Sequence, residues 1–362
     1  MSTFLKIVLM LMIVGLLSLG GLAFWFQSAL EPVASGGGRG AEGSLGHEGS
    51  LGHEGSLGHE GSAKTVAFRV EPGDTLGRVA AELESKGLIR DARVARWFAR
   101  AEEISSGLKV GDYELSPSQS TPEILGTLVE GRVNTYSVVI PEGIRATEIA
   151  DRLAAAGLAD RSAFLEVVLD PGAPARFGVE GPNLEGYLFP DTYRFARGLP
   201  PGRIAETMVA EFKRVYAELV PDPTKQALSM QELTTLASIV EKETGAAHER
   251  PLIAAVFLTR MRRGMRLETD PTVIYGIPNF DGNIRRKHLE DESNPYNTYR
   301  IRGLPPGPIA SPGREALQAV LEPADSPYIF FVSKNDGTHI FSTTYAEHER
   351  NVDRYQRRRR KK

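Results

Sequence analysis

Residues 236–244 read LASIVEKET and bring a carboxylate to the end of an apolar helical ridge. At about 100° per residue, Leu233, Leu236 and Ile239 share one helical face, and Glu243 falls among them. An apolar environment disfavours the charged form of a carboxyl group, so that its pKa rises and it keeps a proton near neutral pH. The pattern therefore makes Glu243 the candidate general acid. The alternative is an ordinary carboxylate at a helix end.

The helix that carries Glu243 has clear signals at both ends. Ser229 and Glu232 form a capping-box pattern that predicts its start, and Gly245 is placed to end it. Glu241 lies roughly 160° from Glu243 around the helix. This angle predicts a solvated position, or one at the rim of a cleft, for Glu241.

Length and composition indicate a globular protein of two or three domains. The chain has 362 residues, of which 41% are hydrophobic, and its formal net charge of -3 argues against general nucleic-acid binding. The basic tail, 353–362, is a solvated end or a docking site for an anionic lipid or polymer. The absence of cysteine excludes disulfides, thiol nucleophiles and thiolate metal sites. We expect neither a cofactor nor a metal.

Residues 7–26 are apolar and uncharged. About twenty residues at 1.5 Å each cross a bilayer core of about 30 Å, so this segment predicts a single transmembrane anchor. Lys6 precedes it and Glu31 follows it, which places residues 1–6 in the cytoplasm. We therefore expect a single-pass protein of the inner, cytoplasmic membrane with its remaining domains on the periplasmic, extracytoplasmic side. A cleaved signal peptide is the alternative, although the apolar stretch is long for one.

A tether, 27–64, is predicted to follow the anchor. It contains three copies of GSLGHE between residues 43 and 60, in a stretch rich in Gly and Ser. This composition cannot bury enough apolar surface to offset the entropy of ordering, which predicts a flexible segment. His47, His53 and His59 could bind zinc weakly, but a flexible segment offers no preformed geometry, and we expect no site there.

The remaining patterns predict an α+β fold. Within residues 65–133 we expect strands near 66–70 and 111–115 and helices near 75–86, 91–101 and 121–130. Residues 134–182 repeat the theme weakly, with a strand and turn over 137–144 and helices near 147–156 and 162–169. In the third region, 183–352, we expect helices over 204–219, from Ser229 to Glu243, and from Pro251 to Gly264.

Five motifs occur in order in the second half of the chain. They are EGYLFPDTY (185–193), ASIVEKET (237–244), TDPTVIYG (269–276), PYNTY (295–299) and GLPP (303–306). Except for the helical second motif, we expect them on loops that line a cleft, because their Asn, Thr and Tyr side chains suit a sugar polymer. With these motifs the chain resembles the endolytic murein transglycosylases of the membrane-anchored G type, formerly called YceG-like proteins. The stretch VEPGDTL, residues 70–76, resembles the LysM module of that family.

The resemblance implies a function and a catalytic residue. It implies that Glu243, the second Glu of EKET, protonates the bond between N-acetylmuramic acid and N-acetylglucosamine, and that the product ends in a 1,6-anhydro sugar. It also implies internal cutting of nascent peptidoglycan glycan strands that ends their elongation, with peptidoglycan synthases as candidate partners. Glu268 stands where the family carries Gln, so this chain departs from the family's pattern at that position. We expect substrate contacts from the residues of these motifs: Glu185, Tyr187, Asp191, Thr244, Thr269, Asp270, Asn297 and Tyr299.

Two other functions remain open from the sequence. A hydrolytic muramidase would need a second carboxylate, for which Asp191 and Asp270 are candidates, although each also suits a turn beside a proline. A wall-binding scaffold without catalysis would use the LysM-like module and the tether alone. The scaffold predicts that replacing Glu243 has no functional effect.

Overall fold

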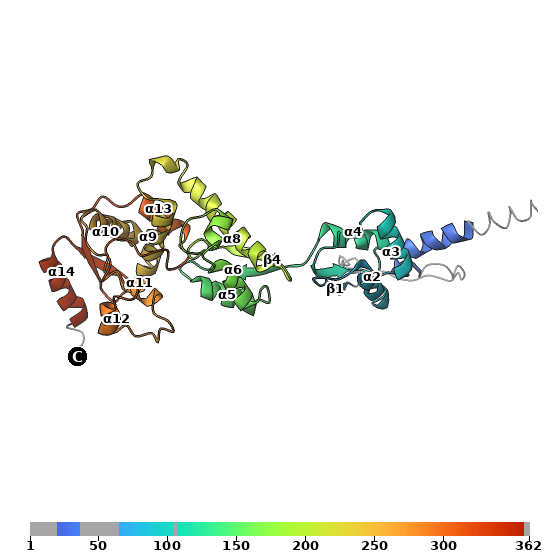
Figure 1. Cartoon of the computed structure of the whole chain (residues 1–362), viewed down its shortest axis with the longest axis horizontal. Coiled ribbons are helices and arrows are strands. Elements are labelled where there is room, and N and C mark those ends of the chain that lie inside the picture. The colour runs from blue at the N-terminus through green and yellow to red at the C-terminus, as the bar shows by residue number, and fades with distance from the viewer. Residues whose placement is uncertain (1–19, 37–64, 105–106, 358–362) are drawn as a thin grey trace, which may run out of the picture. The chain divides into compact units, whose positions relative to one another are not determined.

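The computed structural model describes residues 20–36, 65–104 and 107–357 of the chain (Figure 1). They belong to two compact units, one of residues 1–135 with 196–198 and one of residues 136–195 with 199–362. The described strands form three two-stranded sheets among many helices, which confirms the predicted mixture of helix and sheet. The predicted domain boundaries at 64, 133 and 182 stay predictions.

The first unit is a β-α-α-β arrangement followed by a further helix. Strand β1 (Val66–Val70) pairs antiparallel with β2 (Gly111–Leu115), and α2 (Leu76–Ser85) and α3 (Ala92–Ala101) connect them. Helix α4 (Thr121–Glu130) follows. Each of these elements was predicted, because the helices begin at the capping side chains of Thr75, Asp91 and Ser120, and their apolar faces meet in one core. Its LysM-like identity stays a prediction.

The amino-terminal residues are described only from residue 20. Residues 20–30 are helical and belong to the first unit, and a 3-10 turn follows at Val33–Gly36. The backbone N–H of Ala34 donates to the carbonyl of Pro117 at 3.0 Å, so residues 27–36 of the predicted tether are ordered against this unit. Residues 7–19 of the predicted anchor lie outside the described residues, as do residues 37–64 with the three histidines of the repeat. Among the described helices, none has both the length and the hydropathy needed to cross a membrane.

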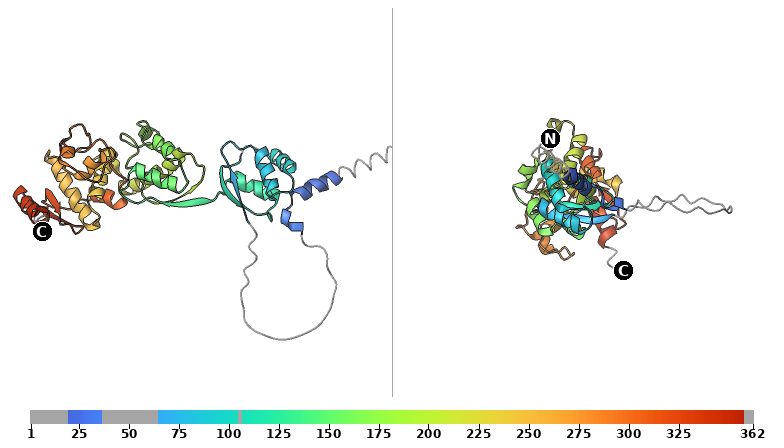
Figure 2. Two further views of the ribbon diagram at one scale, coloured as in Figure 1. Left: turned by 90° about the horizontal axis from the view of Figure 1, so that it is seen from below. Right: turned by 90° about the vertical axis from the view of Figure 1, so that its right-hand side faces the viewer.

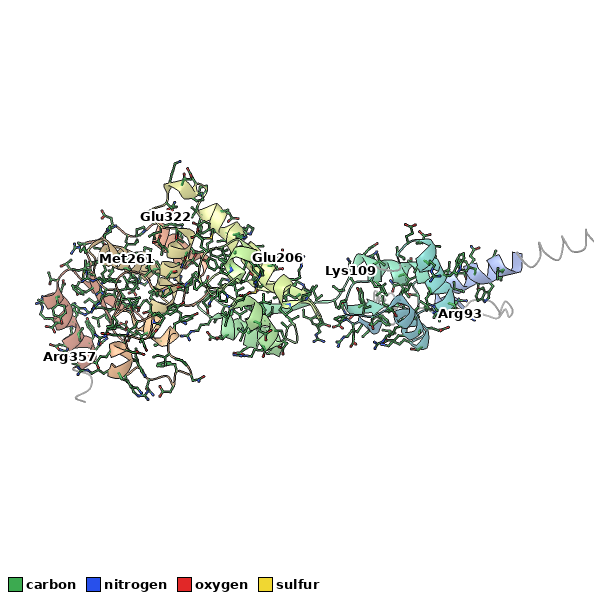
Figure 3. The ribbon with its side chains drawn as sticks, viewed as in Figure 1. Arg93, Lys109, Glu206, Met261, Glu322 and Arg357 are labelled. Atoms are coloured by element: carbon green, nitrogen blue, oxygen red, sulfur yellow. The ribbon has the colours of Figure 1, made fainter. Side chains whose placement is uncertain are left out.

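The second unit contains the remaining elements (Figures 1 and 2). Helix α14 (Tyr345–Val352) contacts the hairpin of β5 (Phe330–Ser333) and β6 (His339–Ser342). Charged side chains lie exposed on the outer faces of both units, as Arg93 and Glu206 illustrate (Figure 3). In chain order the elements are β3 (Thr135–Val139, whose first residue is grouped with the first unit), α5 (Ala146–Ala155), α6 (Arg161–Val168), α7 (Ala173–Phe177), β4 (Thr192–Ala196, whose last residue is likewise grouped), α8 (Pro201–Leu219), α9 (Met230–Glu243), α10 (Arg250–Arg262), α11 (Asp270–Tyr275), α12 (Arg286–Glu290), α13 (Arg314–Leu321), β5 (Phe330–Ser333), β6 (His339–Ser342), α14 (Tyr345–Val352) and a π-helical turn (Asp353–Arg357), with short 3-10 turns at Pro223–Lys225 and Ala247–Glu249.

Helix α9 is the central helix of the second unit and contacts α10, α11 and α13. It begins at Ser229 with the predicted capping box. All residues from 233 to 240 are buried, so the helix is enclosed on every side and is not confined to one apolar face. It ends at Glu243, and Thr244 is already extended, with φ of -143° and ψ of 136°. The predicted end at Glu243 is therefore confirmed, and Gly245 directly follows the C-cap residue Thr244, although it does not adopt the left-handed conformation of many glycines at this position.

The motif EGYLFPDTY belongs largely to the core of this unit. Residues 184–189 are all buried, and the ring of Tyr187 meets that of Phe212 edge-on at 5.0 Å between centroids. Our expectation of a cleft-lining loop is wrong for these residues. Burial of the Leu, Tyr and Phe side chains contributes more favourable free energy than burial of the Glu185 carboxyl group costs.

Candidate functional site

Glu243 lines a pocket of about 390 Å³ in the second unit. The walls come from the end of α9, the segment before α11, the hairpin of β5 and β6, and α14. Of the predicted substrate-contact residues, the pocket includes Thr269, Asp270 and Tyr299. Its other lining residues are Arg260, Leu267, Glu268, Phe331, Val332, Ser333, His339, His348, Val352 and Gln356.

Glu243 has the environment of a carboxyl group that holds its proton. The residue is half-buried, and burial raises the pKa of its carboxyl group. A hydrogen bond from Thr269 Oγ1 to Glu243 Oε1 and the charges of His339 and Arg260 oppose this rise, whereas Asp270 adds to it. The partial negative charge at the end of a helix also favours the protonated form. Burial of Glu243 in the structure therefore agrees with the raised pKa that the sequence predicts.

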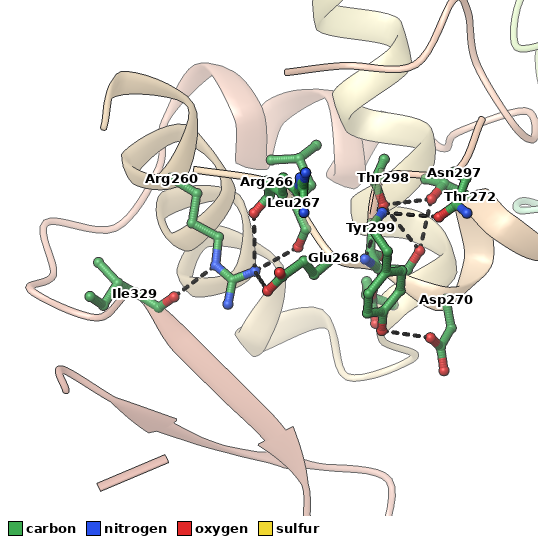
Figure 4. Close-up of polar contacts among 12 residues, drawn as sticks. Arg260, Arg266, Leu267, Glu268, Asp270, Thr272, Asn297, Thr298, Tyr299 and Ile329 are labelled. Carbon is green, nitrogen blue, oxygen red and sulfur yellow. Dashed lines mark hydrogen bonds and ion pairs between the residues drawn. The ribbon is translucent and has the colours of Figure 1, made fainter. Parts of the chain in front are cut away.

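The buried hydroxyl groups of Thr272 and Thr298, both labelled in Figure 4, hold the backbone of Thr269 in place. The backbone N–H of Thr269 donates to Thr298 Oγ1 at 3.1 Å, and Thr272 Oγ1 donates to the carbonyl of Thr269 at 2.7 Å. The hydroxyls of Thr272 and Thr298 lie 2.8 Å apart. This network fixes the backbone of Thr269, so that its own hydroxyl stays directed at Glu243.

Asp270 lies on the same wall, at the first turn of α11. Tyr299 donates its hydroxyl to Asp270 Oδ1 at 2.8 Å, and the carboxylate is exposed (Figure 4). The expectation of a loop over residues 269–276 is wrong, because residues 270–275 are helical. Pro271 does not prevent this helix, because the first turn needs no N–H from it.

Arg260 and Glu268 form a charged pair at the pocket (Figure 4). The guanidinium of Arg260 is buried and donates to the carbonyls of Leu267 at 2.7 Å and Ile329 at 2.8 Å, and lies 3.6 Å from a carboxylate oxygen of Glu268. Glu268 has φ of +52°, a left-handed conformation that a residue with a side chain rarely adopts. The residue that departs from the expected Gln therefore faces the pocket from a strained backbone.

Glu185 lies in the interior, away from the residues that line the pocket. Its carboxyl group accepts hydrogen bonds from the N–H of Ala146 at 3.0 Å and from the hydroxyl of Tyr275 at 3.3 Å. Burial raises the pKa of Glu185 to about 7. The acid caps the start of α5 and ties it to α11.

The other four predicted contact residues are also outside the pocket lining. Tyr187 and Thr244 are buried, and Asp191 is exposed directly before β4, with its carboxylate accepting from the N–H of Thr192 at 2.6 Å. The side-chain amide of Asn297 is fully buried and donates to backbone carbonyls, among them that of Asp291 at 2.7 Å. Substrate contact by these residues and by Glu185 stays a prediction.

The prediction that Glu241 is solvated or lies at the rim of a cleft is wrong, because its side chain is buried and does not line the pocket of Glu243. Its side chain is only 7% exposed and lies 3.1 Å from the guanidinium of Arg250. It also accepts from the N–H of Gly313 at 3.2 Å. Arg250 lies on α10 and compensates the buried charge of the Glu241 carboxylate. The sequence around residue 241 contains no pattern that indicates this contact.

Sequence reasoning missed several residues of the pocket, including Arg260, His339 and His348. His339 begins β6, and His348 lies on the short surface helix α14. Neither residue stands in a catalytic motif, and both reach the pocket only through tertiary folding. Among the described residues, no group of His, Cys, Asp and Glu has the arrangement of a metal site.

Known proteins are similar to this chain over most of its length. Residues 68–354 match the YceG-like family. The endolytic murein transglycosylase of Bacillus subtilis strain 168 is 29% identical over 312 residues, which cover 81% of this chain and 86% of that protein. The endolytic murein transglycosylase of Streptococcus pneumoniae strain D39 is 27% identical over 322 residues, which cover 80% of this chain and 58% of that protein.

A solved structure agrees with the sequence matches. The 2.6 Å crystal structure of a putative YceG-like protein from Listeria monocytogenes is 32% identical to this chain and has a TM-score of 0.55. The match covers 80% of this chain and all of the solved one. The protein belongs to the YceG-like family.

Proposed function

We propose that this protein is an endolytic peptidoglycan lytic transglycosylase, with Glu243 as its acid and base. One observation carries the proposal: a half-buried carboxyl group of raised pKa opens into a polar pocket and accepts a hydrogen bond from Thr269. Its relatives with the name endolytic murein transglycosylase support the same activity.

The chemistry requires one group that gives and then takes a proton. Glu243 protonates the glycosidic oxygen as the bond to C1 of N-acetylmuramic acid breaks, and the substrate's acetamido group helps to stabilise the cationic centre. The Glu243 carboxylate then removes the proton of the C6 hydroxyl as that oxygen bonds to C1. The products are a free N-acetylglucosamine hydroxyl end and a 1,6-anhydro end, and Glu243 regains its proton.

Product analysis tests the reaction class. Mass spectrometry of uncross-linked glycan strands after digestion should find anhydro ends. Each is about 18 Da lighter than the reducing end that a hydrolase makes, because a hydrolase adds one water molecule to the cleaved bond and a transglycosylase does not. Reducing ends would instead support a muramidase. Asp270 would then be the candidate second carboxylate, because it lines the pocket with Glu243 whereas Asp191 does not.

The variant Glu243→Gln separates the enzyme from a wall-binding scaffold. Gln keeps the shape of the side chain but has no acidic proton, so we expect cleavage to fall by about 10²-fold to 10⁴-fold while glycan retention stays unchanged. Glu241→Gln is a neighbouring comparison, because that side chain faces Arg250 and lies outside the pocket. Cleavage by Glu243→Gln at the wild-type rate would contradict the assignment.

The location of the reaction is a further part of the proposal. The apolar residues 7–26 anchor the chain in the cytoplasmic membrane, and the segment up to residue 64 tethers the catalytic unit near its outer face. New glycan strands emerge there, so the enzyme cuts nascent strands internally and ends their elongation, beside the peptidoglycan synthases. The LysM-like module adds contact with the glycan. Protease treatment of sealed inside-out inner-membrane vesicles checks the orientation. A second unit on the periplasmic side would be protected inside the vesicle, whereas one on the cytoplasmic side would be digested.

A further inference from the structure

A buried carboxylate connects the catalytic end of α9 to the β5–β6 hairpin. Glu249 is only 3% exposed, and its Oε1 accepts from the backbone N–H of His339 at 2.8 Å. Its Oε2 lies 2.8 Å from Nδ1 of the His339 ring and 3.3 Å from the hydroxyl of Thr244, which donates to it. Thr244 directly follows Glu243 in the chain. Glu249 therefore holds the backbone beside the acid and the ring on the facing hairpin together.

The carboxylate also determines which nitrogen of the His339 ring carries hydrogen. Burial would raise the pKa of Glu249, but the hydrogen bonds and charge of His339 together lower it, so Glu249 stays ionised. An ionised carboxylate has no proton to donate, and Nδ1 of His339 must therefore be the donor. Nε2 is the ring nitrogen that remains for the pocket. The ring packs edge-on against Phe331 at 5.3 Å between centroids, which limits its rotation.

His339 lines the pocket together with several charged and titratable side chains. Glu243 enters from α9, Arg260 from α10, and Asp270 and Glu268 from the segment before and at the start of α11. Tyr299 and His348 complete the titratable lining, and burial lowers the pKa of His348. His339 is held by a buried carboxylate within this set, and its positive charge favours the ionised form of Glu243.

We propose that Glu249 and His339 form a positioning pair for the catalytic acid: Glu249 fixes the ring of His339 through Nδ1, and the ring stabilises the carboxylate that Glu243 becomes after it gives up its proton. The inference rests on the proposed function of Glu243. It explains how one acid serves both halves of the reaction without a second catalytic carboxylate. Nothing in the motif around Glu243 indicates this pair, because Glu249 and His339 are 90 residues apart.

The pH dependence of the rate tests the pair in the full-length protein. Glu243 starts the reaction protonated, so kcat falls as the pH rises through its pKa. His339 lowers that pKa, and its removal should therefore move the falling limb to higher pH. We expect His339→Asn and Glu249→Gln to shift this limb upward by about half a pH unit or more and to reduce kcat about 10-fold, with KM nearly unchanged. Release of chain ends from uncross-linked glycan strands measures the rate.

The variants separate this role from a structural one. Asn at position 339 can still donate to Glu249 from nearly the place of Nδ1, so the hairpin contact survives while the imidazole ring is lost. His248→Gln, beside Glu249 but exposed, should match the wild type. If both variants have a reduced kcat but an unmoved falling limb, the contact is only structural and the proposal is overturned. Variants with the kcat and the falling limb of the wild type would also overturn it. Reducing ends from the wild type would instead contradict the transglycosylase assignment, and the limb comparison would still report on the pair.

Discussion

At the scale of single residues, Thr269 controls how firmly Glu243 holds its proton. Its hydroxyl donates to the carboxylate and so favours the ionised form. Thr269→Val keeps the shape but removes the donor, which should raise the pKa of Glu243 further and move the falling limb of the rate profile to higher pH. We expect kcat at the optimum to drop about 10-fold, because the acid also loses its orientation.

A threonine elsewhere provides the comparison for this substitution. Thr207 is exposed on α8, and its hydroxyl donates to the carbonyl of Arg203 within the same helix at 3.0 Å. Thr207→Val should leave the pH profile as it is. A Thr269→Val enzyme whose limb coincides with that of the wild type would show that the hydroxyl does not influence the acid.

At the scale of secondary-structure elements, Glu185 connects the start of α5 to α11 by a carboxyl group with a pKa of about 7, above its ordinary value of 4.5. As the pH rises from 4.5 to 7, the unfolded chain loses this proton before the folded one. The contribution of Glu185 to stability is therefore greatest below pH 4.5 and declines toward pH 7, by about 3 kcal/mol at most. Glu185→Gln should flatten the fall in Tm over this range.

The comparison for this prediction is an exposed acid in a helix. Glu166 lies exposed on α6, and Glu166→Gln should keep the pH dependence of the wild type. Thermal unfolding of the three proteins at a series of pH values checks the expectation. Equal slopes for wild type and Glu185→Gln would mean that Glu185 is ionised in the folded protein.

The segment 185–189 packs closely against the loop that contains Pro308. Gly186 has φ of +85°, and a Cβ there would lie 2.3 Å from Cβ of Pro308. We expect Gly186→Ala to reduce the free energy of unfolding by about 2–4 kcal/mol. Gly202 in α8 has open space around it, and Gly202→Ala should be neutral or stabilise by up to about 1 kcal/mol. Urea unfolding distinguishes them, and equal stabilities would contradict the packing argument.

At the scale of the whole molecule, each unit has its own core. Every residue that lines the pocket of Glu243 belongs to the second unit. A fragment of residues 134–362 should therefore fold and cleave soluble uncross-linked strands at a rate within about threefold of the full chain. Circular dichroism and product release check this. A folded but inactive fragment would show that the first unit contributes to catalysis.

The sequence was sufficient for most elements, because their signals are local. Side chains within one turn cap α2, α3, α4 and α9, and the spacing of apolar residues marks the helices. The same local reasoning selected Glu243, whose raised pKa depends on the apolar helix behind it. It failed where a short segment allowed two outcomes, as in the helix at 270–275.

The environment of the other acids was decided only by tertiary structure. Glu185, Glu241 and Glu249 are buried, and each is compensated by a partner from a distant element: Ala146, Arg250 and His339 respectively. Whether a carboxyl group is buried or solvated depends on whether the fold brings such a partner to it, and the neighbouring residues in the sequence do not indicate this. The sequence by itself determined the helices and the acid at the end of α9, whereas the pocket and the groups that surround its proton exist only once the hairpin, α10 and α11 have packed around that end.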